Sequence, residues 1–130
     1  MAATARHITD RAGGAASTVY IDSLAQDGRG VARCDGKVVF VRGALAGETV
    51  VLSRIRHRRH YDEAEAKRII AAAASRVEPR CAHFGVCGGC ALQHLARTEQ
   101  LAVKEQALVD ALERVGGVRP ARLFDRITGP

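Results

Sequence analysis

The sequence predicts a mainly β protein, with a small five-stranded barrel followed by a cysteine-rich loop and one α-helix. Short runs rich in β-branched residues alternate with glycine turns over residues 17–75, which is typical of a small barrel. Three cysteines follow within ten residues. A longer stretch with helical periodicity comes after them. A chain of 130 residues has room for one domain of ordinary size, or for a small domain with appendages.

The elements of the barrel can be justified in chain order. Residues 1–16 are small and polar, and we expect a flexible tail there. Within residues 17–75, the pair Asp35 and Gly36 joins two β runs. This pair predicts a hairpin, because both central positions of a type I′ turn require positive φ. Residues 61–70 contain alanine and glutamate, which favour a helix. Closure of a five-stranded barrel requires a strand there, however, and we predict a strand.

Three segments follow the barrel. We expect a cysteine loop over residues 79–95, a helix over residues 97–117 and an incomplete segment over residues 118–130. Thr98 can cap the start of the helix, and a pair of glycines can stop it. The predicted helix carries one apolar stripe, formed by Leu101, Leu108, Leu112 and Val115.

The charge of the chain favours a polyanionic partner. The formal net charge is +6, and nucleic acid is the usual polyanion for such a protein. An arginine-rich composition inherited from a GC-rich genome would give the same charge without a partner. No apolar run reaches the ~18 residues of a membrane span, and the start lacks the apolar region of a secretory signal. We therefore expect a cytoplasmic protein with no membrane partner, in which clustered cysteines are metal ligands rather than disulfides.

The cysteine cluster has the pattern C-x5-C-x2-C, formed by Cys81, Cys87 and Cys90. A cubane iron–sulfur cluster needs four thiolates, and the glycines between the last two cysteines let the backbone turn tightly around it. Zinc is an alternative, because His94 would complete a Cys3His site, with His83 as a second candidate. A trio of unliganded thiols is the third alternative. No base with an orienting partner surrounds the cysteines, so none is predicted to be a nucleophile.

The iron–sulfur interpretation requires a fourth thiolate, which the C-x5-C-x2-C motif does not supply. Cys34 is the remaining cysteine of the chain, and it lies beside the predicted hairpin turn. There it is expected to be a small packed or surface residue rather than a ligand. The alternative is a cysteine outside this sequence.

A basic segment, residues 54–60, lies at the predicted turn between two strands. Protruding arginines suit phosphate contacts and can stack on bases, and the adjacent tyrosine can stack on a base as well. Three acidic residues follow at once, so a solvated turn without a partner is the alternative. The candidate RNA-binding residues are Arg54, Arg56, Arg58, Arg59 and Tyr61.

These motifs together resemble a known family. The runs Asp27–Arg33, Asp35–Val41 and Gly43–Glu48 resemble a TRAM domain, a small OB-like barrel that binds RNA and is attached to RNA-modifying enzymes. The run Pro79–His94, placed directly after such a barrel, resembles the bacterial 23S ribosomal RNA uracil carbon-5 methyltransferases of the RlmD (RumA) type. The resemblance covers residues 17–117, and the cysteine run is its most specific part.

The resemblance implies a metal centre and a partner. That family binds a [4Fe–4S] cluster through this motif, so Cys81, Cys87 and Cys90 are three implied ligands. The fourth is a cysteine further along the family's sequence, beyond this chain. This favours iron–sulfur over zinc. The implied partner is 23S ribosomal RNA, and a monomer is expected.

The resemblance also implies the chemistry of the longer protein. The family transfers a methyl group from S-adenosylmethionine to uracil, which forms 5-methyluridine, in a C-terminal Rossmann-like domain. This sequence has no strand followed by a glycine-rich loop that could hold the cofactor. We therefore assign no catalytic and no cofactor-binding residue, and expect the chain to end before the catalytic domain. The alternatives are a stand-alone zinc-binding RNA-binding module without catalysis and, less favoured, a TRAM-bearing thiolation or tRNA-modifying relative.

Overall fold

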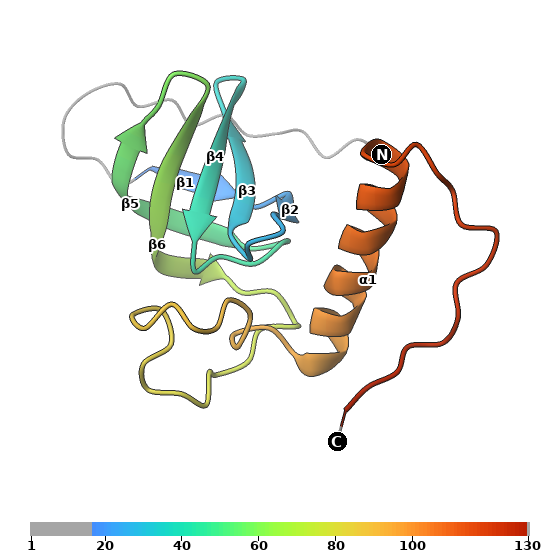
Figure 1. Ribbon diagram of the computed structural model, residues 1–130. Helices are drawn as coiled ribbons and strands as arrows, with labels where there is room; N and C mark the ends of the chain where they lie inside the picture. The colour runs from blue at the N-terminus through green and yellow to red at the C-terminus, as the bar shows by residue number, and fades with distance from the viewer. Residues whose placement is uncertain (1–16, 130) are drawn as a thin grey trace.

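The computed structural model describes residues 17–129 and shows six β-strands followed by one α-helix in this range. The expected tail over residues 1–16 lies outside the described residues. Figure 1 shows the strands gathered in one body, with the cysteine segment (yellow) and the helix beside it. The elements are β1 (Thr18–Tyr20), β2 (Ser23–Leu24), β3 (Gly30–Cys34), β4 (Lys37–Arg42), β5 (Thr49–His57), β6 (Tyr61–Ala71) and α1 (Arg97–Arg114).

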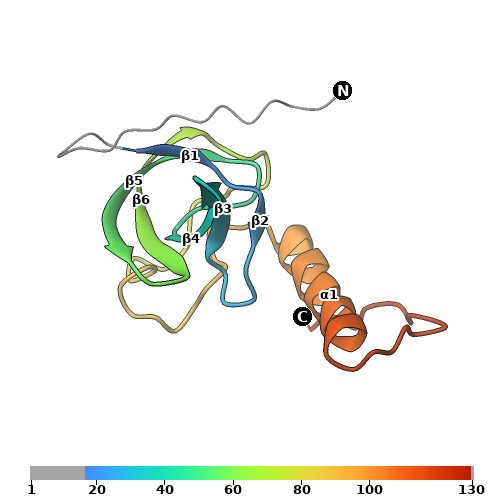
Figure 2. The ribbon, with the colours of Figure 1, turned by 90° about the horizontal axis from the view of Figure 1, so that it is seen from above.

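The strands form one sheet that closes into a barrel. The strand order is β1-β5-β6-β4-β3-β2, and every pair is antiparallel except β4 with β6. The two edge strands, β1 and β2, are consecutive in the chain. Between them, the backbone N–H of Ile21 donates to the carbonyl of Glu48 at 2.8 Å, and that of Asp22 donates to the carbonyl of Val31 at 2.8 Å. One bent segment thus pairs with β5 at one end and β3 at the other (Figure 2). The predicted small barrel is confirmed, with β1 and β2 as halves of one bent strand.

The barrel encloses a small aliphatic core. Alternate residues of β3 and β4 face inward, as the period of two along a strand requires. Most of these side chains are alanine and valine, so each contributes little area to the hydrophobic stabilisation. The core cluster consists of Val19, Ile21, Ala32, Val39, Val41, Ala44, Val50, Leu52 and Ala64.

Two local predictions about the barrel are confirmed by the structure. Asp35 and Gly36 adopt φ values of 50° and 77°, as a type I′ hairpin requires. Residues 61–70 lie within β6, which pairs with both β5 and β4. The hydrogen bonds to two neighbouring strands therefore outweigh the helical propensity of the alanines and glutamates.

The helix α1 begins one residue before Thr98 and has a different start from the one predicted. Ala96 occupies the N-cap position with extended backbone (φ −54°, ψ 141°), and no side chain caps the helix. The predicted Thr98 cap is wrong, because Thr98 lies inside the first turn, where its own backbone is helical. At the other end, the N–H of Val118 donates to the carbonyl of Leu112 at 2.9 Å, with Gly117 at φ 63°. This is the predicted glycine stop.

The apolar stripe of α1 is partly open to solvent, since Leu101 and Leu112 are half-buried and its other two residues are exposed. None of the helix residues is buried, and the side chains of Leu108 and Val115 are 56% and 88% exposed. In the part of the chain that the structure describes, no helix combines the length and apolar character that crossing a membrane requires.

Candidate functional site

The three predicted metal ligands lie on a solvent-exposed loop. Cys81, Cys87 and Cys90 are all exposed. The loop has no strand or helix, and it turns at Gly85 (φ 85°) and Gly88 (φ 77°). These left-handed conformations are open to glycine at little cost, which explains the glycines between the cysteines.

The donor chemistry of this loop suits an iron–sulfur cluster, although the sulfurs are not gathered. Three thiols on one exposed loop can supply three of the four thiolates that such a cluster takes. The backbone at Gly89 passes near Cys87, since a Cβ built on Gly89 would lie 3.5 Å from Cys87 Sγ. Among residues 17–129, however, no three His, Cys, Asp or Glu side chains lie close enough together to hold a metal ion. The ligand set therefore stays a prediction.

His94, the fourth ligand of the zinc alternative, is buried rather than exposed. Only 2% of it is accessible, and its ring lies 5.1 Å from that of Phe84, tilted by 37°. Neither ring nitrogen has a hydrogen-bond partner among the described residues. Burial lowers the pKa of His94, and the nearby Arg76 lowers it further, against a smaller opposing effect of Glu48.

Cys34 packs against the barrel core, as expected for a residue that is not a ligand. It lies at the end of β3 and is partly buried. Burial raises the pKa of its thiol, and the charges of Asp35 and Asp62 raise it further. Cys34 is therefore a protonated, packed side chain.

A buried ion pair joins the barrel to the segment that leads into the cysteine loop. The carboxylate of Glu48 is fully buried and accepts hydrogen bonds from Arg76 Nε (2.6 Å) and Nη2 (2.9 Å). The backbone N–H groups of Leu45 and Ala73 also donate to it, at 2.8 and 3.2 Å. Burial by itself raises the pKa of Glu48, but these hydrogen bonds outweigh it, and the pKa lies below its ordinary value.

Sequence reasoning missed this ion pair. The available signal is that Glu48 opens a run, Thr49–Leu52, that is otherwise apolar or β-branched. A carboxylate in such a place is either at the surface or paired with a cation. The sequence does not show that the cation is Arg76.

The two ends of the cysteine segment are held together at the barrel. Arg76 and Leu95 form an isolated β-bridge, and the N–H of Val77 donates to the carbonyl of His94 at 2.9 Å. The turn between β2 and β3 contacts the same segment: a Cβ built on Gly28 would lie 2.9 Å from the carbonyl oxygen of Ala91. The two ends of the cysteine loop therefore lie side by side and are fixed to the barrel.

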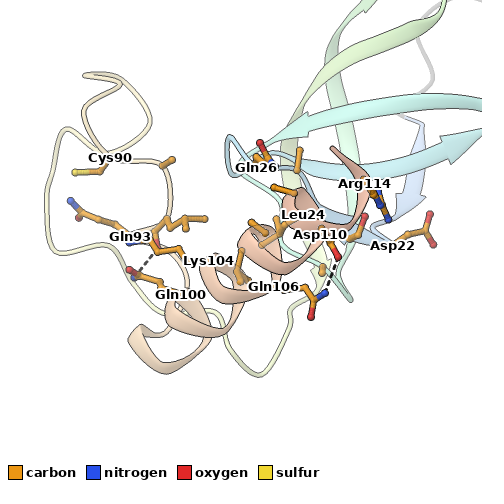
Figure 3. Close-up of a pocket in the computed structure, with 18 of the residues that line it drawn as sticks. Asp22, Leu24, Gln26, Cys90, Gln93, Gln100, Lys104, Gln106, Asp110 and Arg114 are labelled. Atoms are coloured by element: carbon orange, nitrogen blue, oxygen red, sulfur yellow. Dashed lines mark hydrogen bonds between the residues drawn. The ribbon is translucent and has the colours of Figure 1, made fainter. Parts of the chain in front are cut away.

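A groove of about 950 Å³ lies between α1, the end of the cysteine loop and β2 (Figure 3). Its wall on α1 includes Val103, Ala107 and Ala111. Gln100 lines the groove and joins the helix to the end of the cysteine segment, because its Nε2 donates to the carbonyls of Leu92 (3.0 Å) and Leu95 (2.7 Å). Sequence reasoning missed this groove, since it depends on where the helix lies relative to the barrel. Cys90 is the one predicted ligand that lines it.

The predicted RNA-binding arginines lie around the turn between β5 and β6, but they are not equivalent. Arg56 and Arg59 are exposed and have no ion pair within the described residues. Arg54 lies 3.7 Å from Glu65 Oε2, and Arg58 Nη2 lies 3.2 Å from Glu63 Oε2. The two free guanidinium groups are therefore the better candidates for phosphate contacts.

Tyr61 contacts a second aromatic ring, which the sequence analysis did not single out. Its centroid lies 5.6 Å from that of Phe40, at an interplanar angle of 76°. The guanidinium carbon of Arg29 lies 4.6 Å from the centre of the Phe40 ring. The available signal is the alternation of β4, in which Val39 and Val41 are buried and Phe40 therefore faces outward.

Residues 13–66 match the family model of the TRAM domain, which covers most of the barrel. The barrel is a TRAM domain. The cysteine segment and α1 follow the barrel in the chain.

The chain as a whole is similar to ribosomal RNA methyltransferases. It is 59% identical over 110 residues to a protein of Aromatoleum aromaticum named 23S rRNA (uracil(1939)-C(5))-methyltransferase RlmD, a match to 85% of this chain and 25% of that one. Relatives of the same name in Azoarcus sp. (strain BH72) and Acidithiobacillus ferrooxidans are each 50% identical, over 87% and 86% of this chain and 26% of each relative. The chain thus spans about a quarter of these relatives. The resemblance to the RlmD type is confirmed.

Proposed function

We propose that this chain is the RNA-binding portion of an S-adenosylmethionine-dependent 23S rRNA uracil-5-methyltransferase, which forms 5-methyluridine. The observation that carries the proposal is the 59% identity to an RlmD over 110 residues. The TRAM domain and the net charge of +6 support it. The chain acts as a monomer in the cytoplasm, where its ribosomal RNA partner is made. We assign methyl transfer to no residue of this chain.

The role of the barrel is to bind folded 23S rRNA through its phosphates. Arg56 and Arg59 extend from the β5–β6 turn without a carboxylate partner in the described residues, so their charges are available to an anion. Each phosphate contact of this kind releases counterions, which makes the affinity depend on salt. Arg54 and Arg58 have weaker roles, because Glu65 and Glu63 already neutralise part of their charge.

The role of the cysteine loop is to hold a [4Fe–4S] cluster through Cys81, Cys87 and Cys90, with a fourth thiolate from outside this sequence. When bound, the cluster supplies a rigid inorganic core that fixes the loop. The exposure of the three thiols and the glycine turns between them support this assignment. The Glu48–Arg76 ion pair and the Arg76–Leu95 bridge hold the base of the loop against the barrel.

The enzyme assignment is tested with a chimera. The matching 110 residues of the Aromatoleum aromaticum relative are replaced by those of this chain. Transfer of tritiated methyl groups to 23S rRNA that lacks the modification is then measured. We expect the chimera to methylate the RNA at a rate within about tenfold of the parent, because 59% of the exchanged residues are identical. A chimera that folds but transfers no methyl group would contradict the assignment.

The metal assignment is tested on the same chimera, purified without oxygen, because the relative's sequence can supply the fourth thiolate. We expect iron and sulfide with broad absorbance near ~400 nm, lost in Cys87→Ala and kept in Cys34→Ala and His94→Leu. Cys34→Ala is the matched control, since that cysteine packs in the barrel. Stoichiometric zinc that is lost in His94→Leu would instead support the zinc-binding module. Protein that carries no metal under any condition would show that the thiols are unliganded, and would overturn both the iron–sulfur and the zinc assignments.

A further inference from the structure

The outer face of the barrel carries a continuous row of side chains across four strands. Directly paired residues on neighbouring strands point to the same side of a sheet. The pairs Val31–Phe40, Phe40–Glu63 and Glu63–Arg56 therefore place all four side chains in one row. This row faces outward, because the intervening residues Val39, Val41 and Ala64 are buried in the core.

The next row adds the second aromatic ring and another arginine. Arg33 pairs with Val38, and Val38 pairs with Tyr61. The Phe40 and Tyr61 rings meet edge to face at 5.6 Å across these two rows, and Tyr61 is 38% exposed. Aromatic rings on the outside of a barrel that has none in its core do not serve the packing of that core.

Cations surround the two rings. Arg33 and Arg56 lie at opposite ends of the rows, exposed and without an ion pair in the described part of the chain. Glu63, in the middle, accepts from Arg29 Nη1 at 3.4 Å and from Arg58 Nη2 at 3.2 Å. It therefore holds these two guanidinium groups beside the rings, where Arg29 also lies over Phe40.

We propose that this aromatic surface, formed by Phe40, Tyr61, Arg33 and Arg56, binds unpaired bases of single-stranded RNA. A base would stack on the exposed tyrosine ring, while the arginines at the ends of the rows contact the phosphates on either side. Bases inside a duplex are already stacked on one another and cannot use such a surface. The proposal rests on the RNA-binding function proposed above and identifies the form of RNA that the barrel takes.

The test uses the 130-residue chain and a 12-nucleotide single-stranded RNA that contains 2-aminopurine. The fluorescence of this base is quenched when it stacks. We expect quenching on binding, and about a tenfold loss of affinity in Tyr61→Leu and in Phe40→Leu, with the salt dependence unchanged. Arg33→Gln should instead reduce the salt dependence. A duplex of equal length should bind the wild type and the aromatic variants equally.

Tyr20→Leu is the matched control, because Tyr20 is 57% exposed on β1, outside this surface. Its affinity should equal that of the wild type. Tyr61→Leu removes a side chain that is 38% exposed, so a cooperative thermal transition should remain and show that the variant folds. If Tyr61→Leu and Phe40→Leu bind the single strand as tightly as the wild type does, the proposed role of the aromatic surface is wrong, while the proposed RNA-binding function stands. If the wild type binds neither RNA, both proposals are wrong.

Discussion

Glu48 bears a charge in a place where charges are costly. A carboxylate without accessible surface is stable only when its oxygens are fully hydrogen bonded and a cation is near. Arg76 supplies the cation and two of the donors, and the backbone supplies two more. The arginine also donates to the carbonyl of Gly43 at 2.7 Å, so one side chain joins three parts of the chain.

We expect Glu48→Ala to lower the free energy of unfolding by about 3 kcal/mol, because it leaves the Arg76 guanidinium and two backbone N–H groups without their acceptor. Urea denaturation followed by circular dichroism measures this. Glu78→Ala is the control, since Glu78 is exposed, and its effect should stay below about 0.5 kcal/mol. Equal effects of the two variants would show that the buried ion pair does not stabilise the fold.

The same carboxylate predicts how stability depends on pH. Burial opposes ionisation of Glu48 and Asp62, but hydrogen bonds from Arg76 to the former and from Lys37 and His57 to the latter lower both pKa values. A group whose pKa is lower in the folded state stabilises the fold above its unfolded pKa. Stability should therefore be full above about pH 5 and fall as the pH drops through about 4. Thermal midpoints between pH 3 and 7 measure this loss, which should be shallower in Glu48→Gln.

At the scale of elements, the contact between the β2–β3 turn and the cysteine segment positions the loop. Gly28 has φ 86°, and its Cα lies so close to Ala91 and Leu92 that a Cβ would meet both. The turn and the loop base are therefore packed backbone to backbone. The anchors on the other side, Arg76 and Leu95, complete a base from which the three exposed cysteines extend.

We expect Gly28→Ala to increase the hydrogen exchange of residues 91–95, because the added Cβ pushes the segment away from the turn. Gly47→Ala is the matched control, since Gly47 has the same φ of 86° with nothing within 4 Å of an added Cβ. Both variants should lose about 1 kcal/mol from backbone strain. Only Gly28→Ala should change the exchange near the loop, and equal exchange in both would contradict this contact.

Across the whole molecule, the outer face of the barrel carries arginines beside Phe40 and Tyr61, while the groove beside α1 mixes apolar side chains with charged ones such as Lys104 and Asp110. The proposed RNA-binding surface lies on this face of the barrel. The apolar stripe of α1 stays open, with Leu108 56% exposed. The chain spans about a quarter of its relatives, so most of their length has no counterpart here.

The distribution of ion pairs predicts how RNA binding responds to salt. Arg56→Ala should reduce the slope of log affinity against log salt by about 0.7, because it removes one phosphate contact to a single strand. Arg58→Ala should reduce it by less, since Glu63 already pairs with that guanidinium. The slopes of the two variants are measured by fluorescence anisotropy of a labelled RNA at salt concentrations from about 50 to about 300 mM. A larger change in Arg58→Ala would reverse the proposed ranking.

Local signals predicted much of the fold. The Asp35–Gly36 hairpin follows from two adjacent residues, and the glycine stop of α1 follows from Gly116 and Gly117, because turn and cap conformations depend on neighbours in the chain. The start of the helix was less predictable. Thr98 has a side chain that can cap a helix, but Ala96 occupies the N-cap position. The preceding loop ends at Ala96, and the side chain of Gln100 donates hydrogen bonds to carbonyls of that loop.

By itself, the sequence determined the barrel, its hairpin, the clustered cysteines and the resemblance to the RlmD type, because these depend on periodicity and on residues close together in the chain. Only the tertiary structure decided that Glu48 pairs with Arg76, which is 28 residues away, and that Phe40 meets Tyr61 beside Arg29. It also decided which arginines of the β5–β6 turn stay free. The physical reason is that such contacts arise from strand register and barrel closure, which bring together side chains whose separation along the chain carries no local signal.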